Sequence, residues 1–164
     1  MRSTGEVLGM DREPAAAFLR AQEAAGIDWP AAVRGGVLFA VAERDIEAAA
    51  EVARTLAKGG ARLYAAGRSA RAFAEECAAD VQIVDGGESD SAGIPEVLAG
   101  AFGLVVQTDD DDRRDGAALR RAALEAGVSC VTSIPAARFG ASAAAGAGER
   151  SGVRSLQEWM QRES

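Results

Sequence analysis

The unbroken apolar run Val37-Leu38-Phe39-Ala40-Val41 decides the fold of this chain, because it predicts a strand that is buried on both faces. A helical pattern follows at residues 44–58 and stops at Gly59-Gly60. A second short apolar segment, Arg62-Leu63-Tyr64-Ala65, comes next. A strand, a helix and another strand in this order form a crossover unit, so we expect the two strands to be parallel.

The same alternation continues toward the C-terminus. Further strands are predicted over residues 81–84, 104–107 and 129–132. Between them, one helix is expected to be capped by Ser69, and another, over residues 116–126, by Asp115. The pattern therefore predicts an α/β fold, a three-layer, doubly wound sandwich around a five-stranded parallel sheet.

The flanking segments are less regular. Asp11 is expected to cap an N-terminal helix that runs to about Ala25 and places Phe18 on its apolar face. Residues 29–36 look like a connector, 85–93 like a loop and 94–99 like a short helix, whereas the Ala/Gly-rich residues 135–147 carry no clear pattern. Ser155 and Glu158 have the spacing of a capping box, which predicts a final helix.

The composition excludes several classes of function. The 164 residues carry a formal net charge of −7, which argues against a nucleic-acid surface. No apolar run approaches the about 20 residues that cross a bilayer. Residues 1–6 lack the apolar core of a secretory signal, so we expect a cytoplasmic protein without a membrane partner. Cys77 and Cys130 are too few for a disulfide framework and are expected to be buried thiols.

The sequence contains no histidine. This excludes Ser-His-Asp and Cys-His catalysis, zinc sites with imidazole ligands and any mechanism that uses imidazole as acid or base. The choice of catalytic chemistries is correspondingly narrow.

Two loops at predicted strand ends are candidate ligand sites, because ligands of such sheets bind beyond the carboxyl ends of the strands. Gly67, Arg68 and Ser69 follow the second strand, where backbone N–H groups and the arginine could hold a phosphate. The alternative is an ordinary turn in which Ser69 only caps the next helix. Gln107 and Thr108 end the fourth strand.

Acidic residues offer weaker candidates. Residues 109–112 are four consecutive aspartates, which could bind a hard cation but more simply form a solvated loop, so no metal site is predicted. Asp45, Asp85 and Asp109 stand at strand ends, where an acid–base pair could lie. Each of them more simply caps a helix or faces water, and without a histidine or a paired lysine no mechanism can be built on them.

Two segments carry a resemblance to a known family. Residues 1–12, MRSTGEVLGMDR, open the chain, and Val153-Arg154-Ser155-Leu156-Gln157-Glu158 nearly closes it. The first resembles the end of the second ATP-grasp half of the carbamoyl-phosphate synthetase large subunit. The second resembles the last helix of its methylglyoxal-synthase-like regulatory domain. The resemblance implies a lead-in segment and linker helix over residues 1–34 and the regulatory domain over 35–164.

In that family the domain does no chemistry but binds effector nucleotides such as UMP or IMP and tunes a synthetase of arginine and pyrimidine biosynthesis. The resemblance therefore implies an allosteric module that is not an enzyme on its own, needs no cofactor, and has the synthetase subunits or a second copy as partner. We expect residues 1–26 to carry the docking contact, because Phe18 and its apolar face would otherwise be left uncovered.

The sequence departs from the family at the effector site. Where relatives often have a serine and two lysines, this chain has Ala40, Ile46 and Gly86. The T-x-G-T loop is Ala66-Gly67-Arg68-Ser69, and the N-T-T segment is Gln107-Thr108-Asp109. Losing charge-assisted bonds of about 1.5–3 kcal/mol each would weaken nucleotide binding by orders of magnitude. The effector site is therefore expected to be degenerate, with Arg68 as partial compensation.

Three alternatives remain at this point. Methylglyoxal synthase activity is disfavoured, because that chemistry resembles a paired His and Asp arrangement and the chain has no histidine. A stand-alone sensor could bind a less anionic small ligand through Arg68, Ser69, Gln107 and Thr108. A non-functional fragment of the synthetase large subunit would fold but bind nothing.

Overall fold

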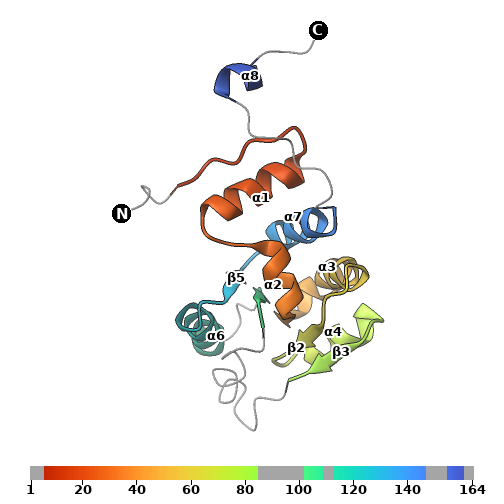
Figure 1. Ribbon diagram of the computed structural model, residues 1–164. Helices are drawn as coiled ribbons and strands as arrows, with labels where there is room; N and C mark the ends of the chain where they lie inside the picture. The colour runs from red at the N-terminus through yellow and green to blue at the C-terminus, as the bar shows by residue number, and fades with distance from the viewer. Residues whose placement is uncertain (1–5, 85–101, 109–112, 147–154, 161–164) are drawn as a thin grey trace.

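The computed structural model describes residues 6–84, 102–108, 113–146 and 155–160. Within them a single sheet has the order β3-β2-β1-β4-β5, and every pair of neighbouring strands is parallel (Figure 1). The strands are β1 (Val37–Ala40), β2 (Leu63–Ala65), β3 (Val81–Ile83), β4 (Leu104–Gln107) and β5 (Ser129–Val131). The predicted α/β fold is confirmed, and it is consistent with a methylglyoxal-synthase-like domain.

Helices cover both faces of the sheet, as a doubly wound sheet requires. One face packs against α3, α4 and α7, with α1 and α2 sharing the same core, and the other packs against α6. The described helices and the 3-10 turn η1 have these bounds: α1 (Pro14–Ala24), α2 (Trp29–Gly35), η1 (Glu43–Asp45), α3 (Ile46–Lys58), α4 (Ala70–Cys77), α6 (Arg113–Glu125), α7 (Ile134–Ala145) and α8 (Leu156–Met160).

All four residues of β1 are buried because successive side chains point into different cores. Phe39 lies on the α3 and α4 side and stacks on Phe73, with ring centroids 4.9 Å apart. Leu38 lies on the opposite side with α6. On that side Tyr64 and Phe102 meet edge to face at 4.7 Å. The apolar run that decides the fold is therefore the centre of both hydrophobic layers.

Residues 29–36 were expected to form a connector, and this prediction is wrong. They form α2, because the Asp28 carboxylate accepts a hydrogen bond from the Ala31 N–H at 3.0 Å and Pro30 stands in the first turn. Trp29 opens the helix and is fully buried. The signals for this helix, an Asp cap followed by proline, were present in the sequence.

Asp11 does not cap the N-terminal helix as predicted. The helix begins at Pro14, and the Asp11 carboxylate instead accepts from the Arg20 Nε at 2.9 Å and from the Arg12 N–H at 2.8 Å. Gly9 lies so close to α1 that a β-carbon there would meet the Ala17 carbonyl oxygen at 2.0 Å. The segment before α1 is thus folded back against the helix.

Two further helix starts differ from expectation. Helix α6 begins at Arg113, so Asp115 lies inside its first turn rather than at the cap. The Ala/Gly-rich residues that carried no pattern form α7, whose cap Ser133 accepts from the Ala136 N–H at 3.4 Å. The capping box is confirmed, since the Glu158 carboxylate accepts from the Ser155 N–H at 2.6 Å. The predicted loop 85–93 and helix 94–99 lie outside the described residues.

Helix α7 lies beside α1 and α2 (Figure 1). An aromatic contact that depends on a glycine holds the three helices together. The Trp29 ring lies over Gly140, where a β-carbon would come within 2.2 Å of the ring. Phe18 meets Trp29 edge to face at 6.1 Å and Phe139 at 6.2 Å. The apolar face of α1 is therefore covered by the chain's own helices, contrary to the expectation that Phe18 is left uncovered.

We expect Gly140→Ala to lower the free energy of unfolding by about 1–3 kcal/mol, because the added methyl group overpacks the contact with Trp29. Alanine raises helix propensity, so a purely local effect would have the opposite sign. Urea unfolding followed by circular dichroism measures the change. Ser142→Ala, at an exposed position of the same helix, is the control and should stay within about 0.5 kcal/mol of the parent. Equal or greater stability of Gly140→Ala would contradict this packing.

Candidate functional site

The order in which the chain adds strands to the sheet reverses between β1 and β4. From β1 it moves outward through β2 to β3, and it then returns to place β4 and β5 on the other side of β1. At the carboxyl ends of these two central strands Ala40 is the register partner of Gln107. This topological switch point is where ligands of open parallel sheets bind, and it is where the predicted residues gather.

Ser69 reaches the end of β1 rather than capping α4. Its side chain makes no cap hydrogen bond, and its buried hydroxyl donates to the Val41 carbonyl oxygen. The prediction of a serine N-cap is therefore wrong in its hydrogen bond, although α4 does begin at the next residue. The hydroxyl ties the β2–α4 turn to the loop that follows β1.

Thr108 holds the same loop from the opposite side. Its N–H donates to the Ala40 carbonyl oxygen at 3.1 Å, and its buried Oγ1 accepts from the Ala42 N–H at 3.2 Å. The Arg44 guanidinium donates to the Thr108 carbonyl oxygen at 3.5 Å. The two predicted hydroxyl residues are thus brought to one place, but both brace the scaffold.

Gln107 is the buried polar group of this site. Its side chain is 1% exposed at the last position of β4. Within the described part of the chain its Oε1 has no hydrogen-bond partner. A buried acceptor without a donor costs about 1–3 kcal/mol, so such an atom calls for a water or a ligand group as partner.

The turn between β2 and α4 contains the other predicted residues. Gly67 adopts φ +86°, a left-handed conformation that favours glycine, and its carbonyl oxygen accepts from the Ala70 N–H at 3.1 Å. Arg68 is exposed in this turn. The turn therefore presents a cation at the surface, one residue away from the buried Ser69.

The remaining strand-end groups add little charge. Asp45 precedes α3 without a side-chain cap hydrogen bond and pairs with Arg44 at 3.8 Å. Ile46, the first residue of α3, is half-buried against the core. Asp85, Gly86 and the acidic run 109–112 lie outside the described residues. In the described ranges no three His, Cys, Asp or Glu side chains gather as a metal site.

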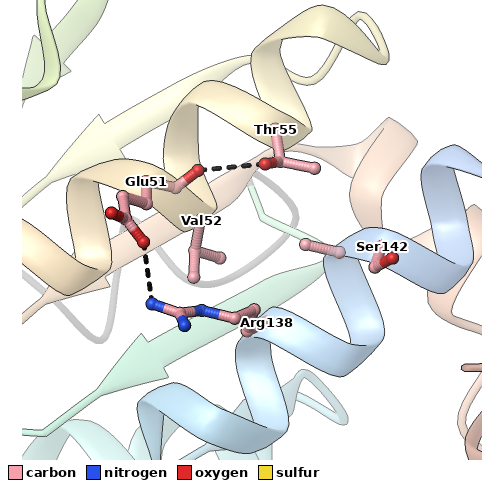
Figure 2. A pocket seen from close by; sticks show the side chains of 6 residues that line it. Glu51, Val52, Thr55, Arg138 and Ser142 are labelled. Atoms are coloured by element: carbon pink, nitrogen blue, oxygen red, sulfur yellow. Dashed lines mark hydrogen bonds and ion pairs between the residues drawn. The ribbon is translucent and has the colours of Figure 1, made fainter.

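A separate hollow of about 290 Å³ lies between α3 and α7, and its lining contains none of the strand-end residues. Figure 2 shows Glu51 and Arg138 joined across it, with 2.8 Å between the carboxylate Oε2 and the guanidinium Nη2. Thr55 does not face a ligand there, because its hydroxyl donates to the Glu51 carbonyl oxygen at 3.0 Å. Both members of the ion pair are more than half exposed, so the hollow is a shallow seam between two helices.

The cysteines are free thiols and not activated nucleophiles. Cys77 is fully buried, and Cys130, the middle residue of β5, is half-buried. Burial raises the pKa of both thiols, and the Arg54 charge near Cys77 and the Arg120 charge near Cys130 oppose it only in part. The prediction of two buried thiols holds fully for Cys77 and only in part for Cys130.

We expect Thr108→Val to lower the free energy of unfolding by about 1–3 kcal/mol, because it leaves the buried Ala42 N–H without its acceptor. The shape of the side chain is kept, so the loss reports the hydrogen bond. Thr132→Val, at an exposed position after β5, is the matched control and should change stability by less than about 0.5 kcal/mol. Equal effects in urea unfolding would show that Thr108 does not brace this loop.

We expect Ellman's reagent to label Cys130 before Cys77 in the native protein and both rapidly in urea. Since folding raises both thiol pKa values, the two thiols stay protonated to higher pH in the folded chain than in the unfolded chain. The free energy of unfolding should therefore fall as pH rises from about 8.5, the ordinary thiol value, through the raised values. Cys130→Ser should leave one slow thiol, and a fast one in that variant would contradict the burial of Cys77.

Comparison with curated proteins identifies homologues over most of the chain, whereas no protein-family model matches it. It is 35% identical over 84% of its length to the carbamoyl phosphate synthase large chain, C-terminal section, of Methanopyrus kandleri, and 31% over 84% to that of Methanocaldococcus jannaschii. It is 37% identical over 96% of its length to the carbamoyl phosphate synthase large chain of Micrococcus luteus. The matches span 26%, 22% and 15% of these relatives, respectively. The chain is therefore homologous to a section of the carbamoyl phosphate synthase large chain.

Proposed function

We propose that this chain is a non-catalytic regulatory module of a cytoplasmic carbamoyl phosphate synthase, one that binds a small effector at the switch point and docks onto the catalytic part of the synthase. The observation that supports the proposal is the strand-end site of a homologue of the large chain. At its centre lies the buried Gln107 Oε1, which has no hydrogen-bond partner among the described residues. Regulation of this enzyme places the module in arginine and pyrimidine supply.

A purely catalytic role has no support in the chemistry of the site. The hydroxyls of Ser69 and Thr108 are engaged with backbone groups of the loop after β1. The sequence offers no imidazole as acid or base. A site made of braced hydroxyls and one neutral amide is suited to holding a ligand rather than to transforming it.

The nucleotide site of the family is degenerate in this proposal. The positions of Ala40 and Ile46 carry no polar group, so a phosphate would lose two of the contacts that the resemblance implies. Arg68 is exposed on the β2–α4 turn and could supply part of the lost charge. UMP and IMP would then bind weakly at best.

The docking surface is the segment that folds back on α1. The Asp11 carboxylate, only 3% exposed, pairs with Arg20 and fixes this segment, so Leu8 is presented to solvent at 79% exposure. A fixed and exposed apolar side chain is the kind of group that forms the centre of an interface.

Among the described residues, none of the helices has the length and apolar character of a membrane span.

The test is co-elution of this chain with the carbamoyl phosphate synthase subunits in size-exclusion chromatography. We expect a complex, and we expect Leu8→Asp to abolish it by placing a charge in the interface. Leu124→Asp is the matched control, because Leu124 is 80% exposed on α6, and it should leave the complex intact. If the parent chain elutes separately from the synthase subunits at about tens of micromolar, docking is overturned and the stand-alone sensor is favoured. Elution of the chain alone at twice the monomer mass would identify a second copy as its partner and would equally overturn docking.

A further inference from the structure

We propose that the groove between α2, α3 and α7 is a docking site for an acidic polypeptide segment, which places one apolar side chain in the groove and a neighbouring carboxylate beside Arg34. Arg34 and Gly59, which line the groove, stand shortly before β1 and β2, so the groove lies at the amino-terminal edge of the sheet. Its lining contains neither the strand-end residues nor the segment that folds back on α1. The inference therefore goes beyond the proposed function and does not depend on it.

The groove is shallow and mainly apolar. A hollow of about 200 Å³ lies between the last turns of the three helices, and its apolar lining consists of Pro30, Val33, Leu56, Ala141, Ala144 and Ala145. Thr55 and Ala141 also line the hollow of Figure 2, so the two hollows adjoin each other along α3. Pockets for whole small ligands have about 300–1,000 Å³. The smaller hollow therefore suits one side chain of a longer polypeptide.

The floor of the groove selects an apolar side chain. Val33 and Leu56 are buried beneath it, and the small side chains of Ala141 and Ala144 leave it hollow. The Thr55 hydroxyl gives its proton to the Glu51 carbonyl oxygen at 3.0 Å. A polar side chain placed on this floor would lose its water without gaining a donor from it, whereas an apolar side chain gains by leaving water.

The rim of the groove carries cations. Arg34 is exposed and lines the hollow, and the exposed Lys58 stands next to Gly59. Arg62 reaches the same end of α2, where its guanidinium donates to the Gly35 carbonyl oxygen at 3.3 Å. In the part of the chain that the structure describes, Arg34 and Lys58 have no ion-pair partner. In a chain with a formal net charge of −7, unpaired cations on the rim of an apolar groove are complementary to carboxylates of a partner.

Helix ends account for only part of this positive charge. The last residues of α2, α3 and α7 border the hollow, and each helix end carries about half a negative charge that a nearby cation complements. The full charges of Arg34, Lys58 and Arg62 exceed these three half charges. Asp80 precedes β3, which is separated from β1 by β2. The groove is therefore complementary to an acidic segment rather than to a basic one.

Amide chemical shifts of the isotope-labelled full chain test the proposal with three synthetic pentapeptides. The first has leucine between two pairs of glutamates, the second has serine in place of leucine, and the third has lysines in place of the glutamates. We expect the first to shift the signals of Gly59, Ala141 and Ala144 with a dissociation constant of about 1 mM or below at low salt, and the others to bind at least about tenfold more weakly. Equal binding of the first peptide and either of the others would overturn the proposal, as would no shift up to about 10 mM.

Substitutions test the groove itself. We expect Arg34→Glu to weaken the acidic leucine peptide at least about tenfold, and Arg34→Lys to keep its affinity within about threefold. Ala145→Trp, at an exposed position of the lining, should block the hollow and also abolish binding. Arg71→Glu, at an exposed position of α4, is the matched control for charge and should leave the affinity unchanged. Equal effects of Arg34→Glu and Arg71→Glu would show that only the overall charge matters and would overturn the site.

Other occupants of the groove give different results. Shifts of the same signals when the chain alone is concentrated would identify a second copy as the occupant. Isocaproate, which joins a leucine-like body to a carboxylate, would identify a small-ligand site if it bound as tightly as the acidic leucine peptide. Either result would overturn the polypeptide site. Neither changes co-elution with the synthase subunits through Leu8, so this proposal and the proposed function fail independently.

Discussion

The arrangement of the carboxyl-end edge of the sheet depends on how the end of β1 is held. The Val41 carbonyl oxygen accepts from Ser69 on one side, and the Ala42 N–H donates to Thr108 on the other. These two buried hydrogen bonds attach the loop after β1 to both neighbouring strands, so the three strand ends form one rigid edge. The Ser69 hydroxyl proton and the Ala42 N–H are thereby engaged within the scaffold. The rigidity of this edge is therefore built from side-chain hydrogen bonds to the backbone of the loop after β1.

The alanine-rich composition has a matching structural role. Helix α3 buries five residues, four of them alanine or valine, so it lies close to the sheet with little side-chain volume between them. Larger groups are concentrated in a few aromatic contacts, such as Phe39 on Phe73. Charged groups stay at the surface, where Glu51 and Arg138 join α3 and α7 and contribute little energy. The core is stabilised by close approach rather than by bulky side chains.

The sequence predicted the sheet well because each strand is a short apolar run between turn residues, and Val37 to Val41 is the clearest of them. It missed α2, although the Asp28 cap and Pro30 were visible in the sequence. It also missed α7, whose Ala/Gly-rich residues lack a helical stripe and are held in place by tertiary packing. It located Ser69, Gln107 and Thr108 at one edge but misjudged the serine, because a local cap and a distant carbonyl acceptor look alike in sequence. Sequence could not show that Gln107 Oε1 is buried with no donor among the described residues, because this depends on the packing around the end of β4.

The contact of Trp29 with Gly140 also sets which sequences can replace one another. Helix propensity alone favours alanine at position 140, and the close indole ring of Trp29 opposes it. Substitutions at the two positions are therefore coupled. If Trp29 is first replaced by a smaller side chain, alanine fits at position 140. If Gly140 is replaced by alanine first, the contact with Trp29 is overpacked until position 29 changes as well. Among related chains, a bulky ring at position 29 should therefore occur together with glycine at position 140. Such covariation would reflect packing between α2 and α7 and would carry no information about function.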